Sequence, residues 1–295
     1  HEGIAGAVQP PSPVAVDDVG DGDAVQTGRP VAVAERERGT PAGRPALVVT
    51  GLTKRFGGIT AASDLALELR SGTITALVGP NGAGKTTVFS LLTGETRPDA
   101  GRVLLHGEDI TGMRPDQIAG KGMVRSFQNV RVFPRLSALT NVCLAIQDQP
   151  GERIAPLFLR IAHSTASERR VRAQAMEWLS FVGMAEFADQ PAGGLAFGQQ
   201  KLVALARVLA TDAEVILLDE PASGIDEQWV DVMLGLIERL RPQGRTVCIV
   251  EHNLRVVSRL ADHVYFMELG KITAQGTFDE LIGDPRLTEA YFGTG

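Results

Sequence analysis

Short apolar runs alternate along most of the chain with segments in which apolar residues recur at helical spacing. Residues 74–78 and 215–218 are predominantly apolar, which is typical of strands that are buried on both faces. Residues 65–69 alternate between apolar and polar side chains, as in a strand with one exposed face. The predicted strands are residues 46–50, 65–69, 74–78, 215–218, 246–250, 264–268 and 272–275, and the predicted helices are residues 85–93, 168–181, 197–210 and 227–241, followed by a short helix near the C-terminus.

This alternation of strands and helices predicts an α/β fold with a mainly parallel sheet and helices on both of its faces. Residues 114–192 are predicted to be mostly helical, so that they form an insert between two parts of the sheet. We therefore expect a globular domain over residues 46–295 that contains a helical subdomain at roughly residues 125–210.

The first 45 residues differ from the rest of the chain, because six prolines and an acidic run interrupt any regular period. Such a composition predicts a disordered tail or linker. The chain starts at His1, which is consistent with processing or with an origin as a linker inside a longer polypeptide.

Composition excludes several classes of protein. The 295 residues suffice for one large α/β domain, and the net charge of -6 argues against a general nucleic-acid binder. No run of about 18 or more apolar residues appears, so nothing in this sequence is expected to span a bilayer by itself. Cys143 and Cys248 each lie in an apolar run, which predicts small core residues in a reducing compartment.

A glycine-rich segment directly follows the predicted strand at residues 74–78. Residues 79–86 match the pattern G-x-x-x-x-G-K-[ST] and precede a predicted helix. In this context the backbone N–H groups and the helix N-terminus can surround phosphate oxygens. Lys85 can then reach the β- and γ-phosphates, and the Thr86 hydroxyl can ligate Mg²⁺.

Two carboxylates follow the buried strand at residues 215–218. Asp219 is placed to hold Mg²⁺ through water, and Glu220 is placed to polarise an attacking water molecule. Together with the glycine-rich segment, they predict a MgATP site in a P-loop NTPase. These two motifs alone leave adenylate-type kinases, AAA machines and transport ATPases as alternatives.

Further motifs narrow the choice by their order. These are Ser-Phe-Gln-Asn at residues 126–129, Leu-Ala-Phe-Gly-Gln-Gln at residues 195–200, Ser-Gly-Ile-Asp at residues 223–226 and Val-Glu-His at residues 250–252. Their succession over roughly residues 46–295 resembles the ATP-binding-cassette (ABC) family. That resemblance implies a P-loop NTPase core with a mainly parallel sheet, an antiparallel β subdomain and a helical signature subdomain.

The resemblance also implies roles for individual residues. Phe56 would stack on adenine, Gln128 would sense the γ-phosphate and Mg²⁺, and His252 would contact the γ-phosphate. The catalytic set would be Lys85, Gln128, Glu220 and His252, and the Mg²⁺ ligands would be Thr86, Gln128 and Asp219. The implied nucleotide contacts are Phe56, Gly79, Pro80, Asn81, Gly82, Ala83, Gly84, Lys85, Thr86 and Thr87 from one chain, with Ala196, Phe197, Gly198 and Gln199 of the signature segment facing the nucleotide of a second chain.

The signature segment departs from the common Leu-Ser-Gly-Gly-Gln, because Ala196 and Phe197 replace the serine and the first glycine. Loss of the serine hydroxyl removes one charge-assisted hydrogen bond, worth roughly 1.5–3 kcal/mol if nothing replaces it. The variant is similar to the Leu-Ala-Tyr-Gly-Gln-Gln of ATPase subunits from branched-chain amino-acid importers. Residues 52–58, 125–133 and 289–293 resemble the same subfamily, whose relatives that import urea or short amides use similar ATPases.

The resemblance thus implies an ATPase subunit that binds ATP and Mg²⁺, pairs with a second such subunit and docks on transmembrane permease subunits at the cytoplasmic face of the membrane. A solute-binding protein would be an indirect partner, and nucleic acid would not be one. The alternative is a soluble ABC ATPase that acts on the ribosome or nucleic acid, but such proteins often carry two cassettes or a long coiled-coil insert.

Overall fold

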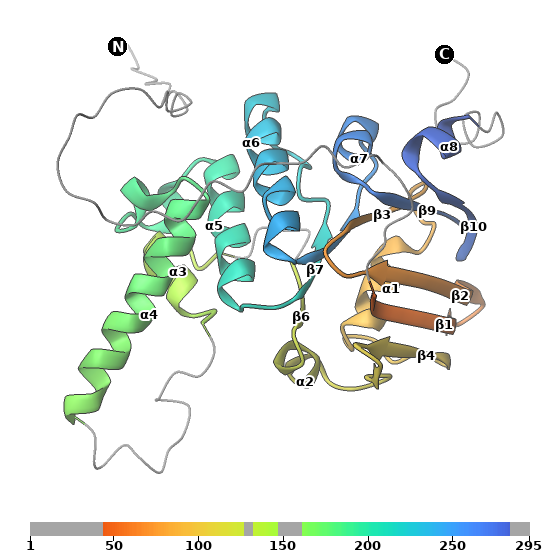
Figure 1. Ribbon diagram of the computed structural model, residues 1–295, viewed down its shortest axis with the longest axis horizontal. Helices are drawn as coiled ribbons and strands as arrows, with labels where there is room; N and C mark the ends of the chain where they lie inside the picture. Colours follow the sequence, from red (N-terminus) through yellow and green to blue (C-terminus); the bar gives the residue numbers. More distant parts are fainter. Residues whose placement is uncertain (1–43, 127–131, 147–160, 284–295) are drawn as a thin grey trace. The chain divides into compact units, whose positions relative to one another are not determined.

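The computed structural model describes residues 44–126, 132–146 and 161–283 of the chain (Figure 1). Its larger sheet has the strand order β10-β9-β3-β8-β7-β6. Neighbouring strands are parallel from β9 to β6, and only β10 runs antiparallel to its neighbour β9. The mainly parallel sheet is therefore confirmed. Its strands are β3 (Ile74–Val78), β6 (Met123–Arg125), β7 (Val215–Asp219), β8 (Thr246–Val250), β9 (His263–Glu268) and β10 (Lys271–Gly276).

The second sheet is antiparallel and has the order β2-β1-β4-β5. Its strands are β1 (Pro45–Phe56), β2 (Ile59–Arg70), β4 (Ala100–Leu105) and β5 (Glu108–Asp109). β1 and β2 extend well beyond the predicted residues 46–50 and 65–69, because register shifts within the pair interrupt the alternation from which strands are recognised. Gly51 and Gly101 approach so closely that a Cβ on Gly101 would lie 2.5 Å from the Gly51 carbonyl carbon.

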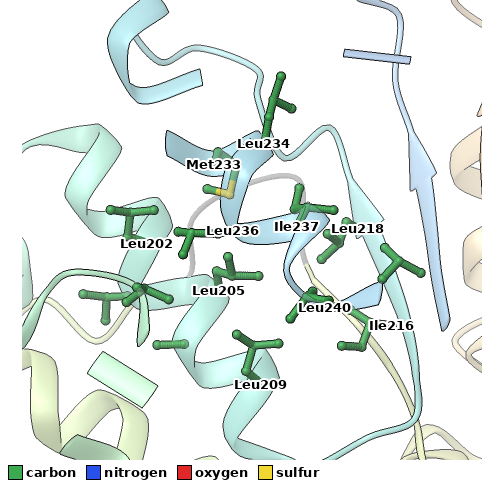
Figure 2. Packing of buried hydrophobic residues seen from close by; sticks show 14 of the residues in the cluster. Leu202, Leu205, Leu209, Ile216, Leu218, Met233, Leu234, Leu236, Ile237 and Leu240 are labelled. Carbon is green, nitrogen blue, oxygen red and sulfur yellow. The ribbon is translucent and has the colours of Figure 1, made fainter. Parts of the chain in front are cut away.

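Successive residues of the parallel strands contribute to two separate cores, as expected for a sheet with both faces covered. Ile216 and Leu218 of β7 pack against α5 (Phe197–Ala210) and α6 (Glu227–Glu238) on one face (Figure 2). Leu217, between them in sequence, faces the core that includes α1 (Lys85–Leu92) and the antiparallel sheet. The core around α5 and α6 also extends to α7 (Leu254–Leu260).

The region between residues 114 and 192 is only partly as predicted. The structure has α2 (Pro115–Gly120), α3 (Ala138–Cys143) and α4 (Ile161–Phe181) there, and residues of α3 and α4 share one core with α5. β6 is a strand that the prediction of a mostly helical region did not include, and it pairs with β7 at the edge of the large sheet. Three residues are too few to display a strand period. The remaining elements are 3₁₀ turns at Ala185–Phe187, Ala192–Gly194 and Arg241–Gln243 and the C-terminal helix α8 (Phe278–Ile282).

None of the helices in the described ranges is both long and apolar enough to cross a membrane. Cys143 and Cys248 are not joined in a disulfide bond. Burial raises the pKa of Cys248 to about 12, so this side chain is an inert core residue. The expectations for residues 1–43 and for the C-terminal motif at residues 289–293 concern parts of the chain outside the described ranges.

The packing of α6 provides a test of the core. Ile237 is fully buried between α6 and the sheet, whereas Val232 on the same helix is 41% exposed. We expect Ile237→Ala to lower the free energy of unfolding by about 2–5 kcal/mol, because it leaves a cavity, and Val232→Ala to change it by about 0.5 kcal/mol or less. Urea denaturation measures both values, and equal losses in the two variants would contradict the packing described.

Candidate functional site

The residues with candidate chemistry gather at one edge of the six-stranded sheet. Because β3, β6, β7 and β8 are parallel, their carboxyl ends meet at this edge. Gly79, Arg125 and Asp219 lie at the ends of β3, β6 and β7, and Glu251 follows β8. In open α/β sheets this edge is where ligands bind.

The segment at residues 79–86 needs glycine at two positions for steric reasons. A Cβ on Gly79 would lie 2.0 Å from the Met267 carbonyl oxygen, and one on Gly84 would lie 2.2 Å from the Ala61 carbonyl oxygen. Gly84 has a φ of 104° directly before α1, a value that side chains disfavour. The segment therefore folds closely around its neighbours and leads straight into the N-terminus of a helix, where an anion is favoured.

Lys85 begins α1, and its side chain folds back across the segment. The ammonium donates hydrogen bonds to the carbonyl oxygens of Gly79 at 2.7 Å and Pro80 at 2.9 Å. Burial lowers the pKa of Lys85, while the carboxylates of Glu220 and Asp219 oppose this shift. A cation is thus held beside the glycine-rich backbone, and Thr86 lies exposed on the first turn of the same helix.

Asp219 is a buried carboxylate at this edge, with a side chain only 1% exposed. Its Oδ2 accepts a hydrogen bond of 2.6 Å from Arg125, and its backbone N–H donates to Ser126 Oγ. Burial raises the pKa of Asp219, and the hydrogen bond from Arg125 opposes this effect. Its Oδ1 is buried without a hydrogen-bond partner among the described residues. An orphaned carboxylate oxygen of this kind fits a hydrated Mg²⁺, a cation that prefers oxygen ligands.

Glu220 follows with a backbone φ of 48°, which is uncommon for a residue with a side chain. Its N–H donates to the Val250 carbonyl, so the turn is joined to the end of β8. Its Oε1 lies 3.8 Å from His252 Nδ1. Strained backbone positions of this kind concentrate at functional sites. The pair is arranged so that the carboxylate can accept a proton from water while the imidazole stays beside it.

The structure therefore brings Lys85, Asp219, Glu220 and His252 to one edge of the sheet, as the sequence predicts. Gln128 lies outside the described residues. Phe56 ends β1 in the antiparallel sheet, where it is 49% exposed and has Lys54 Nζ 5.4 Å from its ring centroid.

The signature segment is positioned by α5. The side-chain oxygen of Gln199 accepts a hydrogen bond from the Ala196 N–H and so closes the N-terminus of this helix. A Cβ on Gly198 would lie 2.6 Å from Trp229 Cγ, so the indole of α6 requires glycine there. Phe197 is 48% exposed. The Gln199 carboxamide, expected at a nucleotide, is mostly buried and caps its own helix.

Two residues that sequence reasoning missed stabilise the loop after Glu220. The Lys201 ammonium donates hydrogen bonds to the carbonyl oxygens of Glu220, Pro221 and Ser223. Glu251 accepts hydrogen bonds from the N–H groups of Ala222 and His252. Lysine is rarely buried. The position of Lys201 within the otherwise apolar face of a predicted helix could therefore have indicated a buried lysine with a structural or functional role.

Burial has opposite effects on these two groups, because it disfavours the charged form of each. It lowers the pKa of Lys201, and the carboxylates of Glu251 and Glu220 oppose that shift. It raises the pKa of Glu251, and the hydrogen bond from the Ala222 N–H opposes that shift. Both charges are therefore held at an energetic cost, which the loop carbonyls and N–H groups offset.

Substitution of Lys201 tests this anchorage. We expect Lys201→Met to lower the free energy of unfolding by about 2–3 kcal/mol, since buried carbonyl oxygens lose their donor. Lys271→Met on exposed β10 should leave stability nearly unchanged. Urea denaturation measures both variants, and a Lys201→Met variant as stable as the Lys271→Met control would show that the loop does not depend on this ammonium.

Comparison with known proteins identifies the family. A sequence profile of the family described as ABC transporter matches residues 62–223. The chain is 38% identical over 251 residues to the high-affinity branched-chain amino acid transport ATP-binding protein BraF of Pseudomonas aeruginosa, a match that covers 85% of this chain and 98% of BraF. It is 36% identical over 255 residues to LivG of Escherichia coli strain K12, which has the same description, with 85% and 98% covered.

Solved structures agree with this result. A nucleotide-free ATP-binding cassette from an ABC transporter matches with a TM-score of 0.74 at 30% identity and covers 85% of this chain and 100% of its own. An ATP-binding cassette of an ABC transporter in its ADP conformation matches with a TM-score of 0.73 at 29% identity and the same coverage. Sequence, fold and the arrangement of the sheet edge thus lead to one conclusion: the chain belongs to the ABC transporter family of ATP-binding cassettes.

Proposed function

We propose that the chain is the ATP-binding and ATP-hydrolysing subunit of an importer for branched-chain amino acids or for related small polar solutes such as urea and amides. The observation that supports hydrolysis most strongly is the convergence of Lys85, Asp219 and Glu220 at one edge of the parallel sheet. The names of the relatives BraF and LivG support the transport role and its substrate class.

In this proposal each group of the sheet edge has one task in the reaction. The backbone of residues 79–84 and the N-terminus of α1 surround the β- and γ-phosphates, and Lys85 exchanges its carbonyl contacts for phosphate oxygens. Thr86, Asp219 and Gln128 would hold Mg²⁺, which would neutralise charge on the phosphates. Glu220 accepts a proton from the attacking water, and His252 stays beside this carboxylate and faces the γ-phosphate.

The signature segment is proposed to complete the site of a second, identical or related ATPase subunit. Phe197 is half exposed at the start of α5, a position accessible to another chain. Neither Ala196 nor Phe197 offers a hydroxyl, so the backbone N–H groups and the α5 N-terminus remain as the donors for a γ-phosphate. We expect a weaker contact than a serine would give, but one that still favours closure of the pair on ATP.

Coupling to transport requires membrane subunits. In this proposal the pair docks on permease subunits at the cytoplasmic face of the membrane, and a solute-binding protein delivers substrate on the other side. ATP binding closes the pair and hydrolysis reopens it, so the free energy of ATP moves the permease. The alternative of a soluble ATPase acting on ribosomes or nucleic acid is disfavoured by the net charge of -6.

Substitution of the general base tests hydrolysis. We expect Glu220→Gln to lower kcat for ATP by about 100-fold or more, because the amide cannot accept the proton from water, and to leave ATP binding intact. Glu214→Gln, at an exposed carboxylate before β7, is the matched control and should hydrolyse ATP at the wild-type rate. Equal rates in wild type and Glu220→Gln would defeat the proposed role of Glu220.

The transport role requires a separate measurement. We expect the affinity-tagged chain to co-purify from membranes of its native host with polytopic permease subunits. Replacement of the native chain by Glu220→Gln should abolish uptake of labelled leucine, or of labelled urea, whereas Glu214→Gln should preserve it. Recovery with ribosomes and without any membrane protein would contradict the transport proposal.

A further inference from the structure

Arg125 is a buried cation at the sheet edge to which the proposed reaction assigns no task. It ends β6, and its side chain is only 8% exposed. Its Nη2 donates to Asp219 Oδ2 at 2.6 Å, and its Nη1 donates to Ser90 Oγ and Glu95 Oε2, both at 2.9 Å. The guanidinium carbon also lies 5.6 Å from the centroid of the Phe89 ring.

These contacts fix the guanidinium from two directions. Ser90 and Phe89 belong to α1, the helix that begins at Lys85, and Glu95 follows that helix closely. Asp219 is at the end of β7. The planar fork of arginine can bind partners on both sides at fixed angles, which a lysine ammonium cannot reproduce. Arg125 therefore sets the position of the Asp219 carboxylate relative to the helix that carries Lys85 and Thr86.

The contact also makes the two oxygens of Asp219 inequivalent. Oδ2 is engaged by Arg125, whereas Oδ1 is buried and has no hydrogen-bond partner within the described residues. Asp219 cannot rotate to present Oδ2 elsewhere without breaking its charge-assisted bond to the guanidinium. Oδ1 is thus the oxygen left for a cation or for its bound water.

We propose that Arg125 is a positioning residue for the Mg²⁺ site, which holds Asp219 so that its Oδ1 faces the metal-bound water. This inference rests on the proposed function, because that function makes Asp219 a Mg²⁺ ligand. Groups that orient metal ligands in this way typically change metal affinity by about 10–100-fold when they are removed.

A purely structural role for Arg125 is the competing explanation. In that case Arg125 would only stabilise the fold, because its ion pair with Glu95 connects β6 to the segment after α1, and it would not affect Mg²⁺ binding. Glu95→Gln separates the two roles, since it removes the other carboxylate partner of Arg125 and leaves the contact with Asp219 in place. Arg245→Lys is a second control, because Arg245 forms an ion pair with Asp212 at a different place in the fold.

The experiment measures ATP binding by calorimetry in EDTA and over a series of Mg²⁺ concentrations. It compares wild type with Arg125→Gln, Arg125→Lys, Glu95→Gln and Arg245→Lys. Urea denaturation of each protein verifies that it is folded. If Arg125→Gln does not fold, Arg125→Lys decides the question, because it retains the buried positive charge and loses only the fork.

We expect the Mg²⁺ concentration for half-maximal enhancement of ATP binding to rise about tenfold or more in Arg125→Gln and by a smaller factor in Arg125→Lys. The ATP affinity of the Arg125 variants in EDTA should stay within about twofold of wild type. The Mg²⁺ requirement of the two control variants, Glu95→Gln and Arg245→Lys, should also stay within about twofold of wild type. An unchanged Mg²⁺ requirement in the two Arg125 variants would overturn the proposal, and so would an equal shift in Glu95→Gln. Failure of the wild type to bind ATP would instead contradict the proposed function.

Discussion

Burial of charge at the carboxyl edge of the six-stranded sheet is the constraint on which the site depends. Lys85, Lys201, Asp219 and Glu251 are each less than a tenth exposed. A buried charge is costly unless other groups compensate it. Each of these side chains accordingly has hydrogen-bond partners on a neighbouring loop or strand, and those partners determine the path of the loops that surround the edge.

The two buried lysines at this edge have different roles. Lys85 contacts carbonyl oxygens of the glycine-rich segment, so its charge lies where phosphate oxygens would arrive. Lys201 contacts carbonyl oxygens of the loop after Glu220, so its charge stabilises the turn that presents this carboxylate. Because Lys201 belongs to α5, the helix of the signature segment, a shift of that helix would act directly on the loop. In the proposed pair, this link would be a physical route from the second subunit to the turn that presents Glu220.

Local sequence patterns predicted the elements that border the site. β3 (Ile74–Val78), α5 (Phe197–Ala210) and β8 (Thr246–Val250) have the predicted bounds, since each is a continuous apolar or amphipathic run of adequate length. Two strands were not predicted. In β4 a glycine and an arginine interrupt the apolar run, and β6 has only three residues. The glycine-rich segment was recognisable from the sequence because its fold leaves no room for a side chain at certain positions, and this fixes the spacing of the glycines.

The contacts inside the site were beyond sequence reasoning. Arg125 and Asp219 are 94 positions apart, and Lys201 and Ser223 are 22 apart, so no local period relates them. They meet only because β6 and β7 are neighbours in the sheet and α5 packs against one face of β7. The roles of Gln128 and Phe56 remain predictions from the family resemblance.

We infer that the charge of Lys85, rather than buried positive charge in general, creates the phosphate site. Calorimetric titration of ATP into Lys85→Met and Lys201→Met tests it most directly, because both variants lose a buried ammonium at the same sheet edge. Lys85→Met should lose about 10-fold or more in ATP affinity, and Lys201→Met should bind ATP as wild type does. Equal losses in the two variants, or full binding by Lys85→Met, would contradict it.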